Sequence, residues 1–106
     1  MEGSGYSSSP EPILWEESVA RKQRDADIFL EYLEARLKQA YAALHDAVAR
    51  HGMQHREVHV ALNTVRALRQ QVEAQRAFVR EIQHLVVSLH LHPELREFYM
   101  LAQRDW

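Results

Sequence analysis

Histidine is the residue type whose number and spacing first suggest chemistry in this chain. The 106-residue sequence contains seven histidines, and His51, His55 and His59 follow one another at intervals of four. On a continuous helix these three imidazoles share one face, and two such histidines can bind zinc, copper or nickel. Gly52 lies inside the set, however, and the sequence has no cysteine. A solvated face beside a turn explains the spacing better than a metal site does, so we expect no metal site or cofactor here.

Paired carboxylates give little support to an active site. Acidic neighbours occur at Glu16 and Glu17 and at Asp25 and Asp27, interleaved with arginine and lysine as on a solvated helix. A glycosidase-like or di-iron centre would need acids that point inward. The sequence also lacks the glycine-rich phosphate loop and the GxSxG nucleophile turn. We therefore expect a protein that is not an enzyme.

Charge composition does not favour binding to nucleic acid. Thirteen basic and fifteen acidic residues give a net charge of −2, so the chain has no overall positive field. Arg66, Arg69, Arg76 and Arg80 lie along one segment, but Glu73 interrupts them. Arginines that flank a helical seam commonly pair with acids on the neighbouring helix. We expect that use here and no nucleic-acid partner.

The N-terminal segment differs in composition from the rest. Residues 1–12 read MEGSGYSSSPEP and are dominated by glycine, serine and proline, which predicts a disordered tail. This start lacks the basic and apolar regions of a conventional signal peptide. No uncharged apolar run approaches the roughly 20 residues that a membrane span requires. We expect a cytoplasmic protein with no membrane span and one helical domain over residues 13–106.

The elements that position all these residues are predicted by two heptad rows. In the later segment, apolar residues alternate at intervals of three and four for more than four heptads, which is typical of a long helix packed along one stripe. Only Gln75 is polar in this pattern. The row contains Val58, Ala61, Val65, Leu68, Val72, Gln75, Val79, Ile82, Val86 and Leu89. An earlier row contains Leu30, Leu33, Leu37, Ala40, Leu44 and Ala47.

A turn at Gly52 would fold these two rows onto each other. Gly52 is the only glycine after the tail, and glycine favours the positive φ that commonly ends a helix. The sequence predicts a helix over about 14–51, a turn at 52–54 and a helix over about 55–91 in an antiparallel hairpin. Facing residue numbers should then sum to about 105. The alternative is one unbroken helix, in which Gly52 costs only about 1 kcal/mol.

Pro93 predicts a further short helix over about 93–104. The second long helix carries more apolar residues past its midpoint than the first helix offers to cover them. We therefore expect an all-α fold in which two hairpins pair into a four-helix bundle, with the short helix as cover or further contact. Gln75 would fix the register, across the axis if two copies meet there. The expected interface consists of Phe78, Val79, Ile82, Leu85, Val86, Leu89, Leu95, Phe98 and Trp106.

These features favour a non-catalytic assembly protein that self-associates as a homodimer or joins a hetero-complex. One alternative is a small helical chaperone that shields an amphipathic helix of a client, as in secretion or particle-assembly systems. A second alternative is a metal-responsive helical protein that uses His55 and His59. The sequence carries no motif that selects among the three, because a fold alone does not imply a function.

Overall fold

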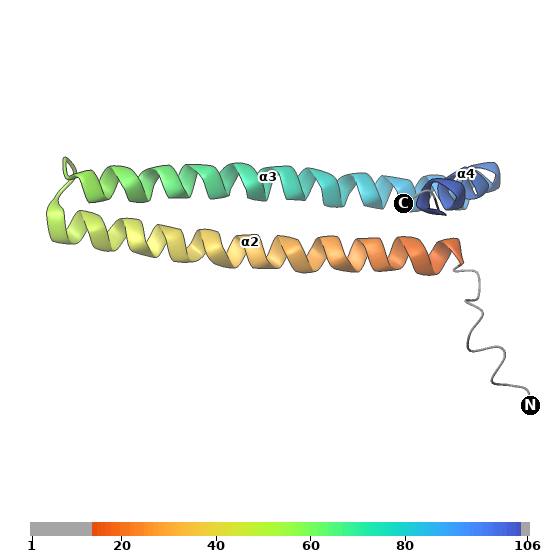
Figure 1. Cartoon of the computed structure of the whole chain (residues 1–106), viewed down its shortest axis with the longest axis horizontal. Coiled ribbons are helices and arrows are strands. Elements are labelled where there is room, and N and C mark those ends of the chain that lie inside the picture. Colours follow the sequence, from red (N-terminus) through yellow and green to blue (C-terminus); the bar gives the residue numbers. More distant parts are fainter. Residues whose placement is uncertain (1–13, 105–106) are drawn as a thin grey trace, which may run out of the picture.

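Two long helices lie side by side and a short one follows them (Figure 1). The structure, a computed structural model, describes residues 14–104. Helix α2 spans Trp15–His51, α3 spans Arg56–Leu91 and α4 spans Pro93–Arg104. The predicted all-α hairpin with a short C-terminal helix is confirmed. The predicted tail at 1–12 lies outside the described residues.

The connection between the long helices is a tight turn at Gly52. Gly52 has a φ of 82°, and its N–H donates a hydrogen bond to the carbonyl oxygen of Val48 at 2.9 Å, which ends α2. Three residues later His55 caps α3, because its Nδ1 accepts a hydrogen bond from the backbone N–H of Glu57 at 3.0 Å. The chain therefore reverses direction, and the alternative of one unbroken helix is wrong.

The core near the middle of the hairpin follows the predicted layers. Ala40, Val65 and Leu68 are buried together, and Leu37 and Leu44 pack against them. Ala40 with Val65, and Leu37 with Leu68, are pairs whose residue numbers sum to 105, as predicted. Alanine on one helix leaves room for a branched residue on the other, which lets the two rows interdigitate.

The open end of the hairpin is better covered than the sequence suggests. Val19 and Ala26 of α2 are buried with Val79, Ile82 and Leu89 of α3. Trp15, Leu30, Leu85, Val86 and Tyr99 are partly buried around this cluster. The first helix covers more of this part than its heptad row suggested, because α2 supplies a tryptophan at its first residue. The short C-terminal helix, one of the two expected covers, adds Tyr99.

Polar contacts join the long helices beside the apolar rows. The Nε2 of Gln75 donates a hydrogen bond to the carbonyl oxygen of Ala26 at 3.0 Å. Arg76 pairs with Glu34 at 2.9 Å, which confirms that a flanking arginine contacts an acid on the neighbouring helix. Within α2, Arg50 pairs with Asp46, one turn earlier, at 3.2 Å.

Within residues 14–104, none of the helices combines the length and apolar character that crossing a bilayer needs.

Candidate interaction surface

Much of the expected interface lies inside the molecule. Val79, Ile82 and Leu89 have exposed fractions of 9%, 2% and 1%, and they contact the chain's own core. Leu85 and Val86 are partly buried against the same core. These five side chains fill the hairpin and are not a free surface for a partner.

The remaining expected interface residues have a different position. Phe78, Leu95 and Phe98 are exposed, although each is large and apolar. Trp106 lies outside the described residues. The exposed part of the expected interface therefore belongs to α4 and to one flank of α3. The attachment of α4 to the hairpin decides which of its side chains face outward.

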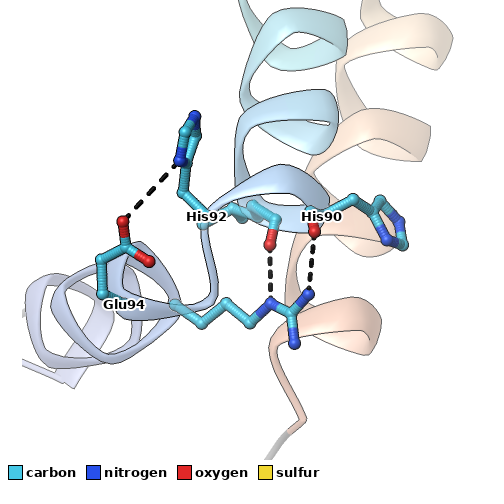
Figure 2. A network of polar contacts seen from close by, with 5 residues as sticks. His90, His92 and Glu94 are labelled. Atoms are coloured by element: carbon cyan, nitrogen blue, oxygen red, sulfur yellow. Dashed lines mark hydrogen bonds and ion pairs between the residues drawn. The ribbon is translucent and has the colours of Figure 1, made fainter.

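Arg96 anchors α4 to the end of α3. Its Nε donates a hydrogen bond to the carbonyl oxygen of Leu89 at 2.6 Å, and one of its terminal nitrogens donates to that of His90 at 3.2 Å (Figure 2). The last carbonyls of a helix lack partners within the helix, so a guanidinium that binds two of them stabilises the helix end. The same guanidinium lies 4.7 Å from the ring centroid of Trp15. Arg96 therefore ties together the start of α2, the end of α3 and α4.

Three further contacts complete this junction. The ring of Trp15 meets the ring of His90 edge-on, with centroids 4.9 Å apart. The hydroxyl groups of Tyr99 and Ser18 are 2.9 Å apart and share a hydrogen bond. His92 and Glu94 approach to 3.7 Å on the exposed side of the connection (Figure 2). The inward contacts of α4 thus combine these polar contacts with the packing of Tyr99 against the core.

The apolar side of α4 consequently faces outward. Leu95, Phe98 and Leu101 repeat every three residues on one side of the helix and are all exposed, Phe98 to 69%. Leu91, the last residue of α3, precedes them and is also 69% exposed. We call Leu91, Leu95, Phe98 and Leu101 the open-end surface. Of the two roles expected for Leu95 and Phe98, cover or further contact, their exposure favours further contact, because Arg96 and Tyr99 occupy the inward side.

Two other apolar surfaces were missed at the sequence level. Beside the turn, a hollow of about 490 Å³ is lined by Leu44, His45, Val48, Ala49, Met53, Val58 and Leu62. On α2, Ile28, Phe29 and Tyr32 are exposed, and the ring centroids of Phe29 and Tyr32 lie 6.1 Å apart. The signal for the second was present, because these three residues fall outside the heptad row of α2.

The candidate metal ligands do not converge. The rings of His51 and His55 stack with centroids 4.0 Å apart, and Nδ1 of His55 is occupied by the backbone of Glu57. Stacked rings do not direct their nitrogens at one point. Among residues 14–104, no three side chains of histidine, cysteine, aspartate or glutamate are arranged to hold an ion. Glu81 and His84 have the Glu-x-x-His spacing of di-iron proteins, but both are exposed.

The register residue has an intramolecular partner. The Nε2 of Gln75 bonds to the backbone of α2 within one chain. Comparisons of the chain with known protein families, with curated proteins and with solved structures found no match.

Proposed function

We propose that this protein is a non-catalytic assembly protein that binds another protein through the open-end surface. The observation that carries the proposal is the outward orientation of the apolar side of α4. Leu91 and Phe98 each leave more than two thirds of their surface exposed. Clustered large apolar side chains on a small protein commonly mark a site of protein–protein contact.

Covering this surface would contribute favourable free energy to association. Covering a fully exposed leucine or phenylalanine yields roughly 1.5–3 kcal/mol. The four side chains of the open-end surface are between 39% and 69% exposed, so each would contribute part of that value. The hydrophobic centre of an interface carries most of the affinity. An apolar helix face of this kind is the usual element of helix-in-groove recognition.

The simplest partner is a second copy of the chain. A hairpin that exposes one such surface pairs isologously when two copies meet face to face, as most homodimers do. The buried hairpin core would stay intact, so this dimer differs from a bundle in which Val79, Ile82 and Leu89 form the contact.

A second candidate is supported by the way α4 is attached. Arg96 and Tyr99 hold α4 to the hairpin partly through polar contacts. A hollow lined in part by Phe78, Ile82 and Leu85 lies next to Tyr99. A client helix that displaced α4 would cover the same apolar residues, which is the behaviour of a chaperone with an internal placeholder.

Sedimentation velocity over a range of concentrations tests the first proposal. We expect the wild-type chain to self-associate and Phe98→Ser to raise the dissociation constant by about tenfold or more, because at least 1.4 kcal/mol of burial is lost. Circular dichroism should show unchanged helix content. Val60→Ser on α3 is the matched control, since Val60 is also exposed and lies far along the hairpin. Equal sedimentation of all three chains as monomers would reject self-association through this surface.

A further inference from the structure

One flank of the hairpin carries opposite charges on its two long helices. On α2, three acids follow one another at intervals of four and three, and this acidic row consists of Asp27, Glu31 and Glu34. On α3, exposed residues at similar intervals form a second row that is mainly cationic. This arginine row consists of Arg66, Arg69, Glu73, Arg76 and Arg80. Residues spaced in this way lie on one side of a helix.

Two observations place both rows on the same flank. Arg76 of the arginine row pairs with Glu34 of the acidic row at 2.9 Å, across the two helices. One turn before Arg66, the arginine side of α3 reaches Leu62, and three turns after Glu34 the acidic side of α2 reaches His45. Leu62 and His45 both line the hollow of about 490 Å³ beside the turn. The flank therefore runs from this hollow to the open end.

The end of α4 lies on the other flank. Gln103 lines two hollows together with Phe78. Phe78 is two residues from both Arg76 and Arg80, which turns it to the opposite side of α3. The attachment of α4 therefore leaves the charged rows exposed.

We propose that two copies of the chain pair side by side along this flank, with their turns at the same end. The inference rests on the self-association proposed above and adds the surface that this association would use. A two-fold axis parallel to the hairpin sets α2 of each copy opposite α3 of the other. The acidic row of each copy then faces the arginine row of the other copy, and this contact occurs twice.

The two rows match in height along the hairpin. Facing residue numbers of the two helices sum to 105, as for Ala40 and Val65, so Asp27 and Glu31 lie at the heights of about residues 78 and 74 of α3. Arg76 and Arg80 occupy the same stretch, and carboxylates would meet guanidinium groups there. A pair with the turns at opposite ends would set α2 against α2 and α3 against α3, which places like charges together. Charge complementarity therefore selects the parallel pair.

Apolar contacts would close both ends of this pair. At the turn, the hollow of one copy would face that of the other, and Val48 and Met53 are among its apolar lining residues. At the open end, Leu91 lies three turns after Arg80 on the same side of α3 and is 69% exposed. The contact is thus continuous with the open-end surface. Lys38 is an unfavourable position, because it would lie near Arg66 of the second copy.

Charge reversal in two separate chains tests the pairing. One chain carries Asp27→Lys with Glu31→Lys, and the other carries Arg69→Glu with Arg80→Glu. Arg76 is left unchanged because it pairs within its own chain. In sedimentation velocity, the dissociation constant of each altered chain alone should rise by about tenfold or more, because like charges then face each other. An equimolar mixture of the two should associate about as tightly as the wild-type chain, since acids again face cations in both contacts.

The matched control is Asp25→Lys with Glu81→Lys, which changes the net charge as much as the first altered chain but on the flank of Phe78. It should associate like the wild-type chain, and circular dichroism should show the same helix content in all variants. If the wild-type chain associates and both altered chains do so equally tightly alone, this flank is not the contact, although self-association stands. A wild-type chain that stays monomeric would instead reject self-association itself.

A distance measurement tests the orientation of the two copies. The chain has no cysteine, so Gln54→Cys provides a single site in the turn for a nitroxide label. Pulsed electron paramagnetic resonance should give a distance below about 30 Å between the two labels, because neighbouring helices pack about 8–10 Å apart. Pairing with the turns at opposite ends, or end to end through α4 alone, would separate the labels by more than about 50 Å, since 36 helical residues span about 54 Å. The longer distance in an associated chain would overturn the parallel pair.

Discussion

Gln75 shows how one polar side chain is accommodated in an apolar row. Its neighbours in the pattern, Val72 and Val79, are buried, whereas Gln75 is half-buried and donates to the carbonyl oxygen of Ala26. That oxygen lies on the opposite helix, so the bond joins the two rows at the level of Ala26. A partly buried amide that has a hydrogen-bond partner avoids the cost of an unsatisfied polar group.

We predict that Gln75→Ala lowers the free energy of unfolding by about 1 kcal/mol, since one partly buried hydrogen bond and its packing are lost. Urea denaturation followed by circular dichroism measures the change. Gln71→Ala, on an exposed position of the same helix, should change stability by only a few tenths of a kcal/mol. Equal losses in both variants would mean that the contact with Ala26 contributes nothing specific.

Contacts of individual side chains were harder to predict from the sequence than the helices. The spacing of His51, His55 and His59 indicated a shared helix face, but Gly52 ends α2 and His55 becomes the cap of α3. Spacing in a sequence predicts a common face only if one helix contains all three residues. No pattern in the sequence predicted the contacts of Arg96, because they depend on where two helix ends meet in space.

Among the elements, α4 has the attachment least expected from its sequence. Leu95 and Phe98 give α4 an apolar side, but the hydrogen bonds of Arg96 hold the helix to α3 through another side. Satisfying two orphan carbonyls with a charged donor competes with burying a leucine and a phenylalanine. Charge-assisted hydrogen bonds are worth roughly 1.5–3 kcal/mol each, which is comparable to the burial forgone.

We predict that Arg96→Ala releases α4 from the hairpin while α2 and α3 stay paired. Amide hydrogen exchange in α4 should become faster by about tenfold or more, because two charge-assisted bonds and the contact with Trp15 are lost. Exchange at the middle of α3 should be unchanged. Arg96→Lys should be intermediate, since an ammonium lacks the planar fork that reaches both carbonyls. Protected amides in α4 of Arg96→Ala would show that other contacts hold the helix.

At the scale of the whole molecule, the heptad rows and two residues that end helices were sufficient for the fold. Gly52 and Pro93 predicted the boundaries of the three helices to within about one residue, because glycine at positive φ and proline at a first turn act locally. Coverage of the distal half of α3 was not predictable in the same way. It depends on Trp15 and Tyr99, which come from opposite ends of the chain and belong to neither row.

The integrity of this core leads to a prediction about folding. Val79→Asp should destabilise the hairpin by about 3 kcal/mol or more, because an unpaired carboxylate would replace a buried methyl-bearing side chain. Glu73→Ala, at an exposed position six residues earlier, should be nearly silent. Thermal unfolding measured by circular dichroism compares them. Similar melting temperatures for the two variants would contradict the assignment of Val79 to the core.

The reversal at Gly52 has a practical consequence for handling the protein. The first residue of α2 and the whole of α4 lie at one end of the molecule, and the turn lies at the other (Figure 1). The longest dimension is 70 Å, and Met53 in the turn is 65% exposed. A fluorophore or epitope introduced at position 53 would therefore stand at the remote end, where it leaves α4 unobstructed.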